Sequence, residues 1–426
     1  SRPGIRLLDR GCYSRNGCLM PVPPRLLRVT DEAEARSELL RIGADPAGIA
    51  RMAPKMVGRL IKLHAISCPA ANILKQEMLS LGGDAAVARG SVACSLPTTD
   101  VLLIGSLKQF RLLVERLGRQ PFGLREQAAR IRALLERLEH PPTFLCGRGL
   151  RLELDRPRIM GILNVTPDSF SDGGRYLSLP SALERARQME GEGVDLIDVG
   201  GESTRPGAPE ISPQEEIDRV VPVVEALGRE TSCPISVDTS KSAVARAALA
   251  AGAHFINDVS GLHFDPTMAA VVADAGAGLF LMHTRGAAAT MQADTEYGDL
   301  VGEVLEYLRA GMARAEAAGI PEDCLAVDPG IGFGKSASGN LEILRRLGEF
   351  RTLGRPLLLG TSRKSFIGKV LGQPEPSRRL YGTLATVALG VRAGAMIHRV
   401  HEVAPAREAA LMAWAIQGGG VATETL

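Results

Sequence analysis

The chain has 426 residues, of which 45% are hydrophobic, and this length exceeds the usual range of a single domain. Residues 1–150 carry 23 Lys and Arg against 13 Asp and Glu, whereas residues 151–426 carry 27 against 35, so the two parts have net charges of +10 and −8. The basic part has few aromatic residues for base stacking and no known basic motif, which argues against a nucleic-acid partner. No apolar run approaches the roughly 20 residues of a membrane span and none resembles a signal peptide, so we expect a soluble protein without a membrane partner.

The cysteines indicate a reducing compartment. They are odd in number, widely scattered and form no CxxC pair: Cys12, Cys18, Cys68, Cys94, Cys146, Cys233 and Cys324. We therefore expect free thiols and a cytoplasmic location.

The N-terminal part reads as a small α/β domain over residues 26–146, after an irregular segment over residues 1–25. Apolar runs predict strands over residues 25–30, 59–66 and 100–106. Helical periodicity predicts helices over residues 31–43, 69–83, 107–118 and 125–140, the first with Asp31 as its N-cap. Proline and glycine place a domain boundary near residues 140–150. No catalytic constellation is visible in this part.

Beyond the boundary, strand-like runs alternate with helical segments. Eight short apolar runs lie at residues 158–165, 194–201, 234–240, 254–261, 279–284, 325–332, 356–364 and 395–402. Continuous apolar runs are typical of parallel strands buried on both faces, and the segments between them are long enough for helical crossovers. This pattern over residues 150–426 predicts an α/β fold of the (β/α)8 TIM-barrel class, with a doubly wound open sheet as the alternative.

Polar residues close these runs. They are Asn164, Asp198, Asp238, Asn257, His283, Asp328, Lys364, and Arg399 with His401. Any one of them is equally well explained as a helix cap, but the carboxyl ends of barrel strands meet on the rim that carries the active site. Eight such ends therefore predict a site there.

The rim chemistry indicates a heterocycle joined to a phosphate or diphosphate. Asp238, Asn257 and Asp328 offer acceptors to a flat ring rich in N–H donors. Basic and hydroxyl side chains at the last two strand ends suit an anion: Ser362, Arg363, Lys364, Arg399 and His401. Asn164 offers a neutral oxygen to Mg²⁺.

Seven motifs along the barrel resemble, in order and spacing, those of the dihydropteroate synthase family. They are GILNVTPDSFSDGGRY, DVGGESTRPGA, ISVDTSKSAVA, INDVSG, DPGIGFGK, GTSRKSFIG and RVHEV, and they lie within residues 159–403. The resemblance implies an Mg²⁺-assisted transferase of folate biosynthesis. It joins 6-hydroxymethyl-7,8-dihydropterin diphosphate to 4-aminobenzoate and gives 7,8-dihydropteroate and diphosphate.

The resemblance also implies residue roles. The pterin set is Asp238, Asn257, Asp328 and Lys364, with Asp198 and Met282 as further substrate-binding positions. Asn164, Arg399 and His401 resemble the Mg²⁺ and diphosphate end, with Asn164 as the metal ligand. Thr204, Arg205, Pro206, Phe333 and Ser362 resemble the groups around 4-aminobenzoate. The catalytic residues are expected to be Asp238, Asp328, Lys364, Arg399 and His401, and residues 164–175 and 202–210 to close over the site. The family also implies a homodimer.

Two alternatives remain open. A pterin-binding methyltransferase acting on methyltetrahydrofolate and a corrinoid shares the ring-binding residues but lacks the SRK and RVH residues and the long first loop. A non-catalytic pterin-binding homologue predicts broken motifs, whereas the departures here are limited to Ser242 and Glu402. The resemblance does not extend to residues 1–150, whose role stays open.

Overall fold

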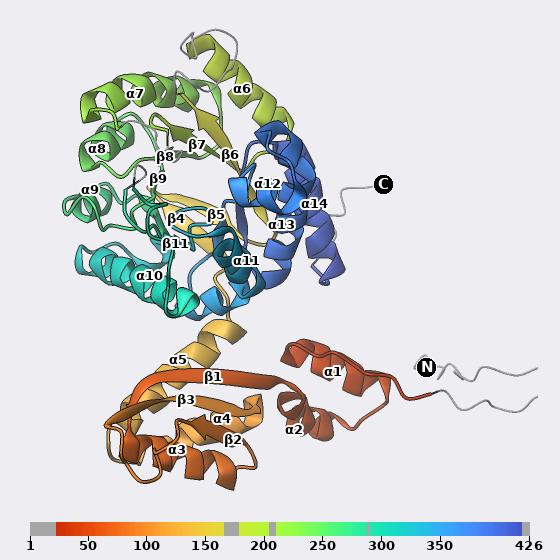
Figure 1. The fold of residues 1–426 in the computed structure, drawn as a ribbon. Coiled ribbons are helices and arrows are strands. Elements are labelled where there is room, and N and C mark those ends of the chain that lie inside the picture. Colours follow the sequence, from red (N-terminus) through yellow and green to blue (C-terminus); the bar gives the residue numbers. More distant parts are fainter. Residues whose placement is uncertain (1–22, 166–178, 204–209, 288–289, 420–426) are drawn as a thin grey trace, which may run out of the picture. The chain divides into compact units, whose positions relative to one another are not determined.

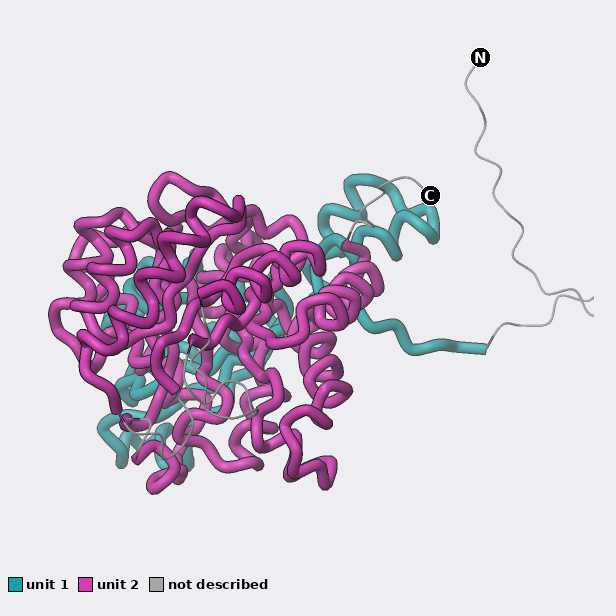
Figure 2. The backbone as a smooth tube through the Cα atoms, turned by 90° about the horizontal axis from the view of Figure 1, so that it is seen from above, with its two compact units in different colours: residues 1–135 teal, residues 136–426 magenta. Residues whose placement is uncertain are grey.

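The computed structural model of this chain describes residues 23–165, 179–203, 210–287 and 290–419. The chain divides into two compact units, Ser1–Leu135 and Glu136–Leu426, coloured teal and magenta in Figure 2. The division falls inside a helix, slightly ahead of the boundary that proline and glycine indicate near residues 140–150. None of the helices in the described ranges combines the length and the apolarity needed to cross a bilayer.

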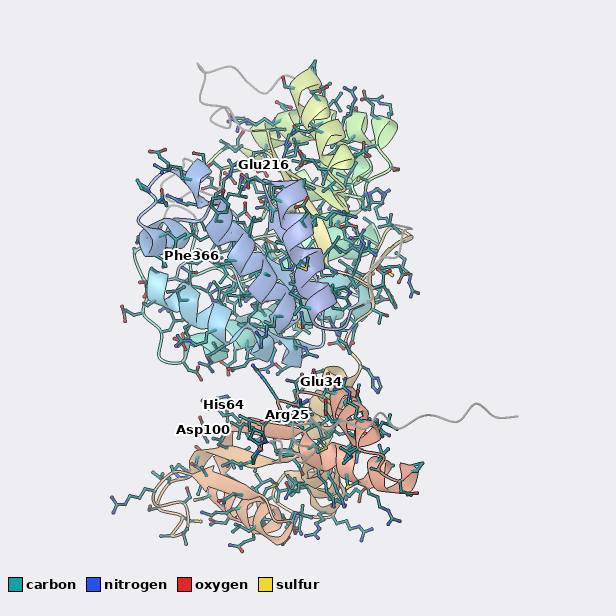
Figure 3. All side chains as sticks on the ribbon, turned by 90° about the vertical axis from the view of Figure 1, so that its right-hand side faces the viewer. Arg25, Glu34, His64, Asp100, Glu216 and Phe366 are labelled. Carbon is teal, nitrogen blue, oxygen red and sulfur yellow. The ribbon has the colours of Figure 1, made fainter. Side chains whose placement is uncertain are left out.

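The N-terminal unit contains a three-stranded antiparallel sheet with the strand order β1-β3-β2 (Figure 1). Its strands are β1 (Gly58–Ser67), β2 (Asp84–Val87) and β3 (Thr98–Ser106). Its helices are α1 (Glu32–Arg41), α2 (Pro46–Met56), α3 (Cys68–Ser80), α4 (Leu107–Leu117) and α5 (Leu124–Glu139), the last of which crosses the division between the units. One face of the sheet packs against helices, whereas the other carries the exposed pair His64 and Asp100, 3.2 Å apart (Figure 3).

Most of the elements predicted for this unit are confirmed, but the strand predicted over residues 25–30 is wrong. Residues 25–30 pair with no strand in the described part of the chain, and Leu26 is 99% exposed. A short apolar run is a weak strand signal without a neighbouring strand to bond its backbone. Asp31 does cap α1, since its side chain accepts from Glu34 N–H at 2.9 Å. Helix α2 and strand β2 were not predicted.

The larger unit is a parallel eight-stranded barrel, as the alternating pattern predicts. The strands are β6 (Arg158–Asn164), β7 (Leu196–Gly200), β8 (Ile235–Asp238), β9 (Phe255–Asp258), β10 (Gly278–Met282), β11 (Leu325–Asp328), β12 (Leu358–Leu359) and β13 (Ile397–Val400). Their order is β11-β10-β9-β8-β7-β6-β13-β12. A parallel bridge between Val327 and Leu357 joins the two ends of this order, so the sheet closes on itself.

Helices surround this sheet in Figure 1. They are α6 (Leu179–Gly191), α7 (Pro213–Glu230), α8 (Ser242–Ala250), α9 (Met268–Asp274), α10 (Leu300–Ala317), α11 (Ala337–Arg345), α12 (Ser365–Leu371), α13 (Leu380–Ala393) and α14 (Val403–Ile416). Three short 3-10 helices, Glu322–Cys324, Leu347–Leu353 and Pro376–Arg379, complete the connections. The main core lies between the helices and the outward side chains of the strands.

A separate apolar layer fills the lower barrel. Its strand residues are Met160, Leu196, Phe255, Phe280, Ala326, Leu358 and Ile397. The hairpin of β4 (Phe144–Gly147) and β5 (Leu150–Glu153) contributes Leu145 and Leu152 to this layer. Arg148 at the hairpin turn holds it in place, because its N–H donates to Gly276 O at 2.6 Å and its Nη1 to Leu249 O at 2.6 Å. The hairpin thus covers the amino-terminal end of the barrel.

Strand periodicity then determines the next layer. Side chains two positions further along a strand point to the same face, one layer higher. Two positions after the seven strand residues of the apolar layer come Ile162, Asp198, Asn257, Met282, Asp328, Gly360 and Arg399. The alternation therefore places a mostly polar layer directly above an apolar one, at the carboxyl ends of the strands.

We predict that Leu145→Ala lowers the free energy of unfolding of the barrel by about 2–5 kcal/mol, because Leu145 is fully buried in the lower layer. Thermal and denaturant unfolding would measure the change. Leu341→Ala on α11, where the leucine is 41% exposed, is the matched control and should change stability little. Equal stability of the two variants would contradict this role of the hairpin.

Candidate active site

One guanidinium joins two carboxylates at the barrel mouth. Arg399 on β13 donates from Nε to Asp198 Oδ2 at 2.6 Å and from Nη2 to Asp238 Oδ2 at 2.7 Å. Asn257 Nδ2 on β9 also donates to Asp198 Oδ2, at 3.0 Å. Asp198, Asp238 and Asn257 are all buried, so residues from four strands form one desolvated polar group.

Two acceptors of this group have no hydrogen-bond partner among the described residues. They are Asp198 Oδ1 and Asn257 Oδ1, both fully buried. A buried acceptor left unpaired costs about 1–3 kcal/mol, so a ligand N–H that reaches it is favoured by the same order. The pair suits a flat ligand with several N–H donors.

Burial controls the charge of Asp238. It raises the pKa of this carboxyl to about 7, and Asp198 and Glu216 add to the effect while Arg399 opposes it. Burial opposes the charge of Arg399 too, but Asp198 and Asp238 outweigh it and raise the pKa of the guanidinium above its usual value. Asp238 therefore changes charge near neutral pH and Arg399 does not.

Lys364, Phe333 and Asp328 form a second group at the barrel mouth, next to the group around Arg399. Lys364, just before α12, donates from Nζ to Ile331 O, and its Nζ lies 4.7 Å from the centre of the Phe333 ring. A Cβ placed on Gly360 would lie 3.8 Å from Asp328 Oδ2 and 3.9 Å from Lys364 Nζ. It would also lie 3.8 Å from Arg399 Cβ, so glycine at this position leaves space where the two groups meet.

Lys364 and Asp328 each affect the pKa of the other. Burial lowers the pKa of Lys364 to about 8, and the nearby Asp328 opposes this shift. Burial likewise raises the pKa of Asp328, against the effect of Lys364. Asp328 is fixed in direction by Gly330 N–H, which donates to its Oδ1 at 2.7 Å. Met282, at the end of β10, is buried and pairs in register with Asp328.

Ser362 and His401 form a third contact, on the side of β12 and β13. The Ser362 hydroxyl lies 2.9 Å from His401 Nδ1 and accepts from the His401 backbone N–H at 3.2 Å. Arg363, which the sequence places with these anion-binding groups, instead donates from Nε to Glu402 Oε1 at 2.6 Å. Its backbone φ of 57° is in the left-handed region. Arg363 therefore maintains the turn rather than pointing freely into the mouth.

Asn164 ends β6 at the same rim. Its amide oxygen would lie 3.4 Å from a Cβ on Gly200, and Asp238 Oδ2 would lie 3.9 Å from the same point. No described residue hydrogen-bonds the Asn164 side chain, and no cluster of three or more His, Cys, Asp or Glu with metal-binding geometry occurs in the described ranges. A cation here would depend on this single neutral oxygen and on oxygens of its ligand. Thr204, Arg205, Pro206 and residues 166–174 lie outside the described residues.

Sequence reasoning missed a buried lysine. Lys335 is 3% exposed, and its Nζ contacts Gly330 O at 2.8 Å, Phe333 O at 3.0 Å and His283 Nδ1 at 2.8 Å. The Lys335 amino group therefore organises the turn that carries Phe333 and Ile331, and burial lowers its pKa well below the usual value of a lysine. Gly330 is required there, since a Cβ would meet His283 O at 1.8 Å. The signal was present in the motif DPGIGFGK, whose last residue is this lysine.

His283, predicted at the rim, serves this turn instead of facing the mouth. It packs against Tyr307, with ring centres 4.7 Å apart, and against Lys335. Burial and the neighbouring Lys335 lower the pKa of His283 to about 2. The ring is neutral at physiological pH.

Comparison with known proteins gives consistent matches. The family described as pterin binding enzyme matches residues 160–401. Dihydropteroate synthase of Synechocystis sp. is 49% identical over 263 residues, which are 62% of this chain and 91% of that protein. A probable bifunctional folylpolyglutamate synthase/dihydropteroate synthase of Halobacterium salinarum is 43% identical over 370 residues, which are 87% of this chain and 44% of that protein, so this similarity extends beyond the barrel. A crystal structure of Yersinia pestis dihydropteroate synthase with a sulfonamide drug complex has a TM-score of 0.62 and 45% identity, and covers 65% of this chain and 99% of that one.

We predict that Lys335→Met lowers the unfolding temperature of the barrel. The change removes the donor to Phe333 O and the contact with His283 Nδ1, whereas Gly330 O still accepts from Phe333 N–H at 3.1 Å. A buried acceptor left unpaired costs about 1–3 kcal/mol. Calorimetry would record the shift, with the exposed Lys369→Met as control. An unchanged or higher unfolding temperature would show that the turn does not depend on the Lys335 amino group.

Proposed function

This chain belongs to the pterin-binding enzyme family, and from that membership we infer that it is a transferase, a dihydropteroate synthase. It joins 6-hydroxymethyl-7,8-dihydropterin diphosphate to 4-aminobenzoate and releases diphosphate. The observation that carries this inference within the molecule is the pair of buried unpaired acceptors at the mouth, Asp198 Oδ1 and Asn257 Oδ1, beside Asp238. No observation favours the methyltransferase or the non-catalytic alternative.

We propose that the pterin ring lies against Asp198, Asp238, Asn257, Met282, Asp328 and Lys364. Carboxylates and amide oxygens accept from the N–H groups of the ring, and Lys364 can donate to its carbonyl oxygen. The C–O bond to diphosphate breaks with its electron pair leaving on oxygen, so positive charge develops on the pterin methylene. Asp238 and Asp328 are suited to stabilise that charge.

We propose that the leaving diphosphate meets Arg399, His401 and Asn164. Arg399 uses two of its five N–H donors on the carboxylates, which leaves donors for an anion. Asn164 is the proposed Mg²⁺ ligand, and its free amide oxygen fits a cation held mainly by phosphate oxygens. Bound Mg²⁺ supplies neutralisation of leaving-group charge.

The 4-aminobenzoate is proposed to bind near Phe333 and Ser362, with Thr204, Arg205 and Pro206. Its amine forms the new C–N bond and then loses a proton. Because an arylamine is already a nucleophile, no side chain has to activate it. The contribution of the protein to formation of the C–N bond is then to position the amine next to the pterin methylene.

We further propose that residues 26–146 form a separate domain without a role in the chemistry, since every proposed site residue comes from the barrel of residues 150–426. A homodimer and a cytoplasmic location also stay proposals. The described cysteines are free thiols, which is compatible with a reducing compartment.

We predict that the purified protein forms dihydropteroate and diphosphate in equal amounts from the two substrates and Mg²⁺, and that Lys364→Ala reduces kcat/KM by at least about a hundredfold, the order of losing one charged contact in the transition state. Lys369→Ala on the exposed face of α12 is the control. Absence of product from folded wild type would refute the function, whereas normal turnover by Lys364→Ala would refute only the site assignment.

We predict a bell-shaped dependence of kcat/KM on pH. Asp238 gains its charge as pH rises through about 7, and Lys364 loses its charge as pH rises through about 8. Activity should therefore rise through the first value and fall through the second. Steady-state kinetics across this range would measure both limbs, and Asp238→Asn should remove the acidic limb. A profile that is flat through both values would be inconsistent with charged Asp238 and Lys364 acting together.

A further inference from the structure

The turn between β11 and α11 offers a row of carbonyl oxygens to side chains. Each carbonyl of residues 330–334 accepts a hydrogen bond from a side chain. In chain order, the donors are Lys335 Nζ, Lys364 Nζ, Gln292 Nε2, Lys335 Nζ and Tyr297 Oη. Two lysines therefore share this turn, because Lys335 bonds the first and fourth carbonyls and Lys364 bonds the second.

The turn holds Lys364 by its head and by its stem. Ile331 O accepts from the Lys364 Nζ, and the centre of the Phe333 ring lies 4.7 Å from the same atom. The stem of Lys364 lies against Gly332, because a Cβ on that glycine would meet Lys364 Cδ at 3.1 Å. Three successive residues of the turn therefore determine where the Lys364 amino group lies.

Lys335 fixes the turn on both sides of these contacts. Its Nζ lies 2.8 Å from Gly330 O, 3.0 Å from Phe333 O and 2.8 Å from His283 Nδ1. Peptide groups are planar and neighbouring planes share one Cα, so a fixed Gly330 carbonyl restricts the direction of the Ile331 carbonyl. The bond to Phe333 O restricts the backbone that carries the aromatic ring in the same way.

An uncharged amine suits this position. Burial lowers the pKa of Lys335 well below its usual value, with Asp328 opposing the shift and Lys364 adding to it. An amine that has lost its proton has two N–H donors, which match the two turn carbonyls, and a lone pair that can accept from His283 Nδ1–H. It adds no positive charge next to Lys364. Lys335 can therefore hold the turn without repelling the other lysine.

We propose that Lys335 is a positioning residue for Lys364, because its amino group holds the Ile331 carbonyl and the Phe333 ring in the directions that meet the Lys364 ammonium. The inference rests on the proposed function, in which Lys364 donates to the carbonyl oxygen of the pterin. The described contacts of Lys335 are with the turn and with His283. Lys335 therefore acts on the reaction through Lys364.

The test is the pKa of Lys364, measured by NMR titration of ¹³C-labelled lysine side chains in the intact chain, with Lys364→Ala to assign the signal. Burial lowers this pKa to about 8, with Arg399 adding to the shift and Asp328 and Asp238 opposing it. Lys335→Met keeps these three charged groups but releases the turn. We expect the pKa of Lys364 to fall by about one unit, the order of one lost hydrogen bond to a charged group. The descending limb of kcat/KM should move to lower pH by the same amount.

Lys335→Gln is the second variant, and it also serves if the methionine variant does not fold. Its amide offers two N–H donors without a charge, but the side chain is one bond shorter than lysine. We therefore expect a smaller fall, with the pKa of Lys364 between those of wild type and Lys335→Met. Leu145→Ala is the control for general loss of stability, since it lies in the lower layer of the barrel and should leave the pKa of Lys364 unchanged.

An unchanged pKa of Lys364 in every Lys335 variant that folds overturns the proposal. A rise also overturns it, because a rise would mean that Lys335 is charged and acts on Lys364 by repulsion. The NMR titration needs no turnover. Its outcomes are therefore distinct from failure of the proposed function, in which wild type itself forms no product.

Discussion

The polar mouth of this barrel depends on one guanidinium held between two buried carboxylates. Asp198 and Asp238 come from adjacent strands and would repel each other in a medium that screens charge poorly. The Arg399 fork reaches both with different nitrogens, which a lysine ammonium, a single point charge, does less well. The contact also depends on the strand order, because β13 lies beside β6 and Arg399 extends past β6 to reach β7 and β8. The arrangement of strands that defines the fold therefore also brings the site residues together.

The layering inside the barrel explains why much of this could be predicted from sequence. The alternation of side chains along a strand depends only on neighbouring residues, so it can be predicted from the sequence. The polar residues after each apolar run follow from this period of two. Which side chains hydrogen-bond to each other, by contrast, depends on residues that are far apart in the sequence. Arg399 and Asp198 are 201 residues apart, and nothing in either motif indicates that they bond to each other. Arg363 was expected among the anion-binding groups, yet its side chain donates to Glu402, which follows α12, α13 and β13 in the chain.

Two lysines, the buried Lys335 and the partly buried Lys241, show more clearly what could not be predicted from the sequence. Lys335 and Lys241 read as ordinary loop lysines, and lysine is usually exposed. In the structure, one is surrounded by backbone carbonyls and an imidazole, and the other by two carboxylates. Only the folded connections bring those acceptors together. The strand predicted over residues 25–30 was wrong for a related reason. The sequence has an apolar pattern typical of a strand there, but the fold places no described strand beside it to bond its backbone.

The two unpaired acceptors at Asp198 and Asn257 imply a limit on how stable this barrel can become. Each is a desolvated atom without a hydrogen-bond donor among the described residues. The protein without its ligand therefore carries a free-energy penalty that a substitution cannot remove without weakening recognition as well. A substitution that supplied an internal donor to either atom would make the protein more heat-resistant and, in the same step, a poorer receptor for its ring. Thermostability and affinity are in direct opposition at these two oxygens.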